Sequence, residues 1–155
     1  MTRKNDTVVI HPPVAPETGN RSIDYRGVSV LLVFSNPVVS DRICHQLERN
    51  ERLMVEICQS EDDAIHLLEY VRFDIILVGY TTGTSDRIRF LRALRIMHPS
   101  IPVIYYPLLR DIPAGNETRE YGPVYFVARQ NRDTSNEPED LYPVIMQVMS
   151  ETGCR

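Results

Sequence analysis

The chain has 155 residues, of which 43% are hydrophobic and 25% are charged, and its formal net charge is −4. This balance is typical of a single globular domain and excludes a wholly disordered chain. The acidic net charge argues against a generally basic nucleic-acid binder. The longest apolar runs, residues 28–34 and 75–78, are far shorter than the roughly 20 residues that cross a bilayer.

Residues 1–26 have the composition of a tail. They include Pro12, Pro13 and Pro16 and many polar residues, and Val8–Ile10 is their one apolar triplet. This composition predicts a disordered leader, within which the triplet could pair with a partner or with an edge strand. We therefore expect a disordered tail at 1–26 and one folded domain at 27–155.

The cysteines and the N-terminus predict a reducing compartment. Cys44, Cys58 and Cys154 are far apart and form no C-x-x-C pair, which argues against a disulfide scaffold or a zinc site. No apolar segment of a secretory signal follows the charged residues at the N-terminus. We expect a cytoplasmic protein that needs no metal and no cofactor.

The first elements of the predicted domain are a strand and a helix. Residues 28–34 form a continuous apolar, β-branched run, which is typical of a strand buried on both faces. Asn36 is a good N-cap and Pro37 suits the first helical position. Residues 38–49 then carry apolar side chains at helical spacing, so we expect a helix there.

A second unit of the same kind follows. Residues 53–58 predict a strand, and Ser60 with Asp63 forms the start of a helix that resembles a capping box. Residues 73–78 predict a third buried strand. The stretch 79–85 is rich in glycine, threonine and serine, so we expect a loop.

The last part of the chain predicts two more strands. A third helix is expected over 86–97, a fourth strand over 101–106 and a fifth strand over 124–128. Pro113 and Gly115 limit any helix between these strands to a short piece near 116–120. A final helix is expected over 139–150, with Pro143 tolerated only in its first turn.

Strands that alternate with helices predict a parallel sheet covered on both faces. For five strands we expect a doubly wound α/β fold of strand order 2-1-3-4-5, a flavodoxin-like three-layer sandwich. In such sheets ligands bind at the carboxyl ends of the strands. The function should therefore be sought in the segments that follow the strands.

Several strings resemble the receiver domain of two-component response regulators, from residue 28 to about residue 150. FSNPVVSDRICHQLE is similar to the family's first strand end and first helix, where Asn36 and Pro37 match. EDDAIHLLEYVRFDIILVG is similar to its second helix and third strand, IPVIYYP to its fourth strand and VYFVAR to its fifth. Asp86 matches the residue that often opens the third helix, and Tyr125 matches the switch aromatic. The resemblance implies a signalling domain in a phosphorelay.

The residues that carry receiver chemistry do not match. Phe34 and Ser35 replace the family's acidic pair, and the phosphorylated Asp falls at Gly79, which has no side chain. Three further positions differ: Pro107 stands at the hydroxyl residue, and Ala128 and Arg129 stand at the Lys–Pro pair. Phosphoryl transfer needs a nucleophile, and Mg²⁺ needs oxygen ligands. The resemblance therefore indicates a pseudo-receiver without a phosphoacceptor.

The vacated acceptor pocket is a candidate site for another ligand. Hydroxyl residues around Gly83 precede a helix, whose N-terminus attracts anions, although capping by Thr84 or Ser85 explains them more simply. A small-ligand or anion sensor is the alternative function, and a flavodoxin-like enzyme is a weaker one because the strand ends lack an acid–base pair. The pocket comprises Phe34, Ser35, Gly79, Thr81, Thr82, Pro107, Ala128 and Arg129.

Arginines and tyrosines are candidates for a partner surface. The arginines of the third predicted helix do not share one narrow face, so a solvated helix surface is favoured over an acidic docking site. Those arginines are Arg87, Arg89, Arg92 and Arg95. Tyrosines suit interfaces, although core packing is expected for at least half of those in the last third of the chain. The predicted partner face consists of Tyr106, Tyr121, Tyr125 and Tyr142.

Together these observations predict a receiver-like domain that acts by phosphorylation-independent protein–protein interaction in signalling or regulation. We expect it not to be an enzyme. Its expected partner is a signalling kinase, an output protein or a second copy of the chain, and neither nucleic acid nor membrane is involved. This expectation rests partly on the analogy between folds.

Overall fold

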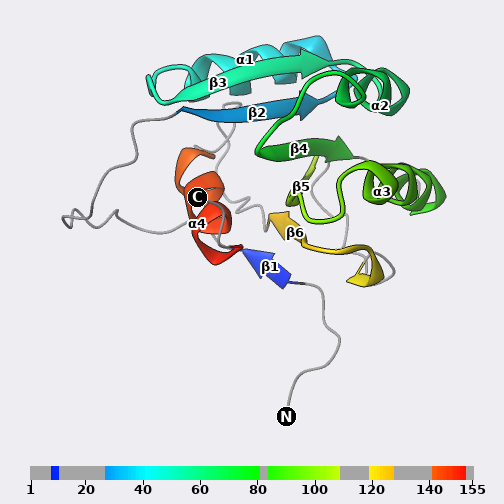
Figure 1. The fold of residues 1–155 in the computed structure, drawn as a ribbon. Helices are drawn as coiled ribbons and strands as arrows, with labels where there is room; N and C mark the ends of the chain where they lie inside the picture. The colour runs from blue at the N-terminus through cyan, green and yellow to red at the C-terminus, as the bar shows by residue number, and fades with distance from the viewer. Residues whose placement is uncertain (1–7, 11–26, 81–83, 109–118, 128–140, 153–155) are drawn as a thin grey trace.

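The computed structural model describes residues 8–10, 27–80, 84–108, 119–127 and 141–152. It shows a parallel sheet between two layers of helices (Figure 1). The strands are β1 (Val8–Ile10), β2 (Val28–Val33), β3 (Leu53–Cys58), β4 (Ile75–Tyr80), β5 (Val103–Pro107) and β6 (Val124–Val127). The helices are α1 (Pro37–Leu47), α2 (Glu61–Leu68), α3 (Thr84–Met97), the 3₁₀ turn η1 (Arg119–Tyr121) and α4 (Tyr142–Glu151).

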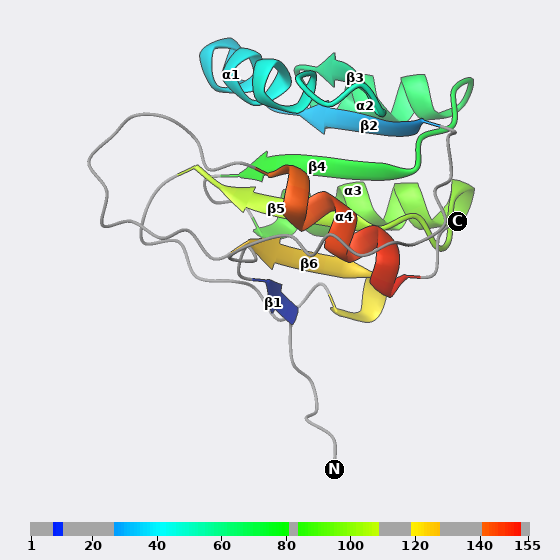
Figure 2. The same cartoon turned by 90° about the vertical axis from the view of Figure 1, so that its left-hand side faces the viewer.

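The sheet has the predicted doubly wound topology. Its six strands are parallel and lie in the order β1-β6-β5-β4-β2-β3. Strands β2 to β6 therefore form a five-stranded sheet of order 2-1-3-4-5, which confirms the predicted fold class. Because all the strands are parallel, their carboxyl ends lie at the same edge of the sheet, as Figure 2 shows for β2, β4, β5 and β6.

Strand β1 extends this sheet beyond β6. The register pairs are Val8 with Tyr125, Val9 with Phe126 and Ile10 with Val127. For these three residues the expected disordered tail is wrong, because the open edge of β6 offers backbone partners to a β-branched triplet. The other residues of 1–26 lie outside the described residues, and the domain start at 27 stays a prediction.

Strand β4 is longer at its carboxyl end than the sequence indicated. The sequence pattern places Gly79 and Tyr80 in a loop, but they pair with Tyr106 and Pro107 of β5. The other boundaries differ by a few residues, with α3 beginning before residue 86 and α4 after residue 139. Between β5 and β6 the described residues contain the short turn η1 and no α-helix.

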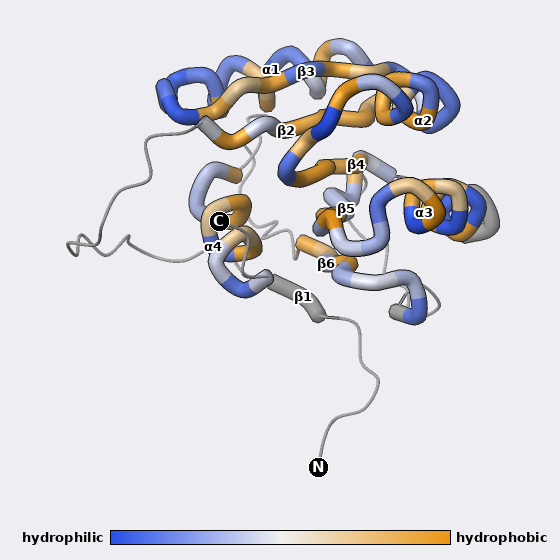
Figure 3. The backbone as a smooth tube through the Cα atoms, viewed as in Figure 1, coloured by the Kyte–Doolittle hydropathy of each residue, from blue (hydrophilic) through white to orange (hydrophobic). Residues whose placement is uncertain are grey.

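Side chains from the two faces of the sheet form two separate cores. Along β2, Val30 and Leu32 pack with α1 and α4, whereas Leu31 and Val33 pack with α2 and α3. This alternation follows from the period of two in a strand, and it makes β2 apolar on both faces. Figure 3 shows the apolar strands between helices that carry polar residues. Among the described residues, no helix is long and apolar enough to cross a membrane.

Two predicted helix caps are present and fix where the strand–helix turns lie. Asn36 accepts a hydrogen bond from the N–H of Val38 at 2.9 Å and precedes Pro37, the first residue of α1. Ser60 accepts one from the N–H of Asp63 at 3.0 Å at the start of α2. These bonds satisfy N–H groups that the helices leave unpaired.

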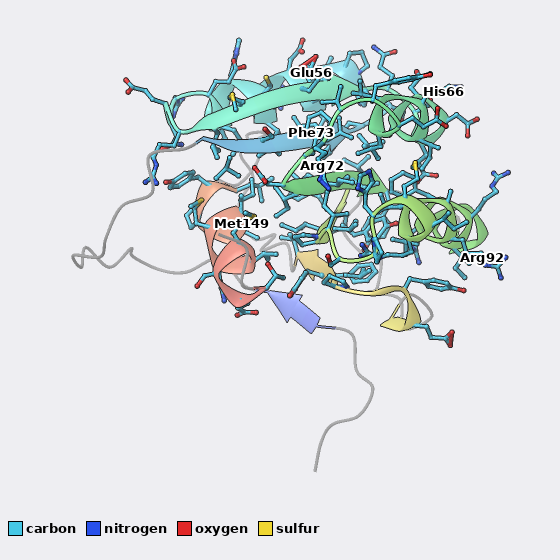
Figure 4. The ribbon with its side chains drawn as sticks, in the orientation of Figure 1. Glu56, His66, Arg72, Phe73, Arg92 and Met149 are labelled. Carbon is cyan, nitrogen blue, oxygen red and sulfur yellow. The ribbon has the colours of Figure 1, made fainter. Side chains whose placement is uncertain are left out.

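Arg95 ties α3 to the segment around η1. Its guanidinium donates to the carbonyls of Tyr121, Ile101 (2.7 Å), His98 (3.1 Å) and Pro123 (3.3 Å). Burial lowers the pKa of Arg95 to about 10, so it stays charged at neutral pH. The expectation of a solvated surface is therefore wrong for Arg95. It holds for Arg92, which is exposed and points away from the sheet (Figure 4).

Replacing Arg95 should destabilise the fold much more than replacing Arg92. Arg95→Ala removes the donor to four carbonyls, and unsatisfied buried acceptors make the expected loss of unfolding free energy about 2–4 kcal/mol. Arg92→Ala lies on the same helix and is expected to change it by less than about 0.5 kcal/mol. Urea unfolding of both variants measures this difference, and equal losses would contradict the role of Arg95.

Candidate functional site

The carboxyl ends of β2, β4 and β5 bring together the described positions of the acceptor pocket. Phe34 continues β2, because its N–H donates to the carbonyl of Cys58 at 3.0 Å. Gly79 lies opposite Tyr106 in the register of β4 and β5, and Pro107 follows as the last residue of β5. Three positions that are far apart in the sequence therefore lie at the edge of the sheet where such folds bind ligands.

The ring of Phe34 occupies the space next to Gly79. A Cβ atom at Gly79 would lie 2.5 Å from both Cδ2 and Cε2 of Phe34. Real Cβ atoms essentially never approach other atoms so closely, so any larger residue would have to displace the ring. Phe34 is completely buried, which leaves the ring little room to move. Gly79 does not have a left-handed backbone conformation, so it is the ring that requires glycine here.

Tyr106 completes an aromatic layer at this position. Its ring centroid lies 6.3 Å from that of Phe34, with the two planes tilted by 49°. Tyr106 is buried, with 2% of its surface exposed. We call Phe34, Gly79 and Tyr106 the aromatic plug. It joins the ends of β2, β4 and β5 through an apolar contact where the receiver resemblance implies an aspartate.

The expectation of a vacated pocket is therefore wrong at its central positions. Phe34 fills the space beside Gly79, and Pro107 is buried at the end of β5. Ser35 is exposed. The remaining pocket residues, Thr81, Thr82, Ala128 and Arg129, lie outside the described residues.

The described residues at this edge do not fit the Mg²⁺ ion that receiver chemistry implies. Mg²⁺ prefers several oxygen ligands in octahedral geometry, mostly carboxylates and water. Phe34 and Gly79 supply no side-chain oxygen, and Ser35 supplies a single hydroxyl. Within the part of the chain that the structure describes, no group of three histidines, cysteines or acidic residues could hold a metal ion.

Solved structures match the chain, although no protein-family profile and no curated protein does. The chemotaxis response regulator CheY4 of Vibrio cholerae has 18% identity and a TM-score of 0.63, over 79% of this chain and 98% of its own. An orphan response regulator of H. pylori has 21% identity and a TM-score of 0.59, and the match covers 82% of this chain and 98% of that one. The third is the receiver domain of a sensor histidine kinase from Pseudomonas aeruginosa, solved with magnesium in its active-site cleft. It has 20% identity and a TM-score of 0.58, and the match covers 82% of this chain and 98% of that domain.

The chain has the fold of a response-regulator receiver domain. Its two helical layers and its strand order are those of the receiver fold, with β1 as an added strand. At identities of about one fifth, the likeness concerns the fold alone.

The receiver fold of this chain contains a buried cation that the sequence did not indicate. Arg87, near the start of α3, is 5% exposed, so the expected solvated position is wrong. Its guanidinium carbon lies 4.9 Å from the ring centroid of Tyr80 and 5.9 Å from those of Tyr105 and Phe126. Cation–π attraction to three rings compensates part of the cost of burying this charge. Nothing in the sequence distinguishes Arg87 from the other three arginines of this helix, so its burial carries no sequence signal.

The tyrosines of the predicted partner face do not form one surface. Tyr106 and Tyr125 are buried in the core beneath α1 and α4, and Tyr142 packs half-buried against the same core. Tyr121 packs half-buried on the opposite side of the sheet. The expected single face is therefore wrong, and the alternative of core packing accounts for Tyr106 and Tyr125.

The two described cysteines are poor nucleophiles. Burial raises the pKa of Cys44 to about 11, and the nearby carboxylates of Glu48, Asp41 and Glu56 add to this effect. Burial also raises the pKa of Cys58. A thiol reacts as its thiolate, so both side chains are unsuited to nucleophilic catalysis near neutral pH.

A double-mutant cycle should show that Phe34 and Gly79 are coupled. Gly79→Ala alone is expected to lower the unfolding free energy by about 1–3 kcal/mol, because the new methyl group overpacks against the ring. In a Phe34→Ala background the same change should cost close to nothing, since the space is then empty. Urea unfolding measures the cycle. Equal costs of Gly79→Ala in both backgrounds would contradict the contact.

Thiol alkylation tests the raised pKa of Cys44. We expect Cys44 in a Cys58→Ser/Cys154→Ser variant to react with iodoacetamide about tenfold more slowly than a peptide cysteine at about pH 8. The shift from 9.0 to about 11 lowers the thiolate fraction about 100-fold, and the greater nucleophilicity of the thiolate restores part of the rate. The rate should still be rising at about pH 10. Reaction as fast as the peptide would contradict the shift.

Proposed function

We propose that this protein is a pseudo-receiver: a signalling or regulatory domain that binds a protein partner in the cytoplasm without being phosphorylated. The observation that carries the proposal is the position of the Phe34 ring, 2.5 Å from where a Cβ of residue 79 would lie. The expected partners are a signalling kinase, an output protein or a second copy. The domain is not expected to be an enzyme.

The aromatic plug removes both requirements of phosphoryl transfer to an aspartate. The acceptor position, Gly79, has no carboxylate, and the adjacent space is filled by an apolar ring. An incoming phosphoryl group carries several negative charges, which a buried phenyl ring cannot stabilise. The charge would have to be balanced by a metal ion or by cations, and the described residues of the plug provide neither.

Rigid packing at this edge supports a constitutive binding role. Phe34 and Tyr106 belong to the core that also contains Ile43 of α1 and Val144 of α4. The end of the sheet is therefore joined to two helices by apolar packing that no ligand is needed to complete. A surface held in one state by such a core would be available to a partner without a covalent switch.

Incubation with acetyl phosphate and Mg²⁺ tests the proposal. We expect no acid-labile phosphoprotein by intact mass, under conditions in which a receiver domain with a complete acidic site is modified stoichiometrically. Gly79→Asp should also remain unmodified, because Phe34 still occupies the adjacent space and no metal ligands have been added.

The outcome distinguishes a receiver domain that is phosphorylated from a pseudo-receiver that is not. A stoichiometric adduct of one phosphoryl group on the wild-type chain would overturn the proposal, wherever the modified residue lies. A Gly79→Asp variant that gains stoichiometric phosphorylation would show that the ring does not block the site. Circular dichroism of the variant checks that it is folded, so that an unmodified chain can be interpreted.

A further inference from the structure

Strand β3 forms the edge of the sheet opposite β1 (Figure 1). It pairs with β2 on one side, and among the described residues no strand pairs with it on the other. Met54 is 56% exposed, and Glu56, which is labelled in Figure 4, is exposed as well. An edge strand offers backbone groups to another strand, so the side chains along it decide which strand can be added.

The hydrogen bonds between β2 and β3 show which backbone groups face outward. The carbonyl of Arg52, just before β3, accepts the N–H of Val28 at 2.7 Å. The carbonyl of Cys58 accepts the N–H of Phe34 at 3.0 Å. Backbone groups of neighbouring residues in a strand point to opposite sides. The even-numbered residues therefore bond to β2, and the odd-numbered ones, such as Val55, direct their N–H and C=O groups away from it.

The side chains on one face of this edge run from positive to apolar to negative. Leu53 and Val55 pack into the core that α1 and α4 cover. Because side chains alternate along a strand, Arg52, Met54 and Glu56 lie on the opposite face. In the reverse direction the same row runs from negative to apolar to positive. An antiparallel second copy therefore presents the complementary charge at each charged position.

We propose that the outer edge of β3 binds a second copy of this chain, antiparallel and around a twofold axis that passes next to Met54. In this register Arg52 of each copy lies opposite Glu56 of the other copy. Opposite charges on directly opposite residues stabilise a strand pair, whereas like charges destabilise it. A symmetric dimer requires one surface that complements itself, and this row of side chains does.

The charges select both the register and the occupant. Side chains of one face must stay opposite each other, so the neighbouring registers differ by two residues. With Glu56 at the axis, the two carboxylates would face each other, and with Val55 at the axis Glu56 would face Met54. A strand that lacks a positive charge at the matching position would leave Glu56 without an opposite charge, and such an edge charge discourages pairing.

The inference rests on the proposed binding function, because it selects the second copy from the expected partners. It involves no phosphorylation. A monomeric chain would overturn the dimer and leave the result with acetyl phosphate as it stands. The two proposals can therefore fail separately.

Charge reversal on the full-length chain tests the pairing. We expect a concentration-dependent wild-type dimer in sedimentation equilibrium. Arg52→Glu and Glu56→Arg each create two like-charge pairs across the axis, so each should weaken the dimer at least about tenfold. An equimolar mixture of these two variants restores both opposite-charge pairs and should form a heterodimer about as tight as the wild type. Arg92→Glu, at an exposed position of α3, is the matched control and should leave the dimer unchanged.

Several results would overturn the proposal. They are a wild type that stays monomeric up to about 1 mM, a reversal that leaves the dimer unchanged, and a mixture that forms no heterodimer. Equal weakening by Arg92→Glu would also overturn it, because the effect would then reflect net charge rather than paired positions. Circular dichroism checks that each variant is folded.

A cysteine at the axis keeps the proposal testable if a reversal variant does not fold. In Met54→Cys/Cys154→Ser the two new thiols lie directly opposite each other, in a pair whose Cβ atoms are about 4.5–5.5 Å apart. A disulfide needs nearly this distance. We expect oxidation to link the two copies, and Tyr70→Cys/Cys154→Ser, 84% exposed at residue 70 and outside β3, to link at least about tenfold more slowly. Equal rates would overturn the proposal.

Discussion

The ring of Phe34 lies against the bare backbone of Gly79 at the carboxyl edge of the sheet, and this contact limits which side chain residue 79 can carry. In a doubly wound sheet this edge is where a ligand or a reactive side chain is normally placed. Here the space is taken by a completely buried ring, held on one side by the end of β2 and on the other by Tyr106. Restoring a side chain at residue 79 would require the ring to leave.

Neighbouring elements hold this contact in place. Asn36 starts α1 two residues after Phe34, which places the helix directly over the core that contains the ring. Pairing of Gly79 with Tyr106 brings the second aromatic ring to the same position. On the other face of the sheet, the rings of Tyr80, Tyr105 and Phe126 pack against one another and against Arg87 of α3. Among the described residues, aromatic side chains therefore pack on both faces of the sheet near this edge.

Much of this architecture could be predicted from the sequence. Apolar runs at strand length, helical spacing and the cap residues Asn36 and Ser60 are local signals, and the helices and central strands follow them closely. The resemblance also places the family's acceptor aspartate at Gly79, and this assignment stays a prediction. Each of these features is determined by residues close to one another in the sequence, so the sequence pattern predicts it.

The features that the sequence did not predict all depend on contacts between distant segments. A filled space beside Gly79 could not be distinguished from an empty one, since the direction of the Phe34 ring depends on three strands. The burial of Arg87 and Arg95 depends on partners in other elements. The pairing of Val8–Ile10 joins the beginning of the chain to its last strand. Such long-range pairings override local composition.

The most direct test of this account is a nuclear Overhauser spectrum of the labelled protein in the absence of ligands. Protons that lie within a few ångströms of each other give strong cross-peaks, so the account predicts intense peaks between the Hα atoms of Gly79 and the ring protons of Phe34. Adding Mg²⁺ should leave these peaks unchanged. Their absence, or their loss when Mg²⁺ is added, would mean that the ring does not occupy the acceptor position and would contradict the account.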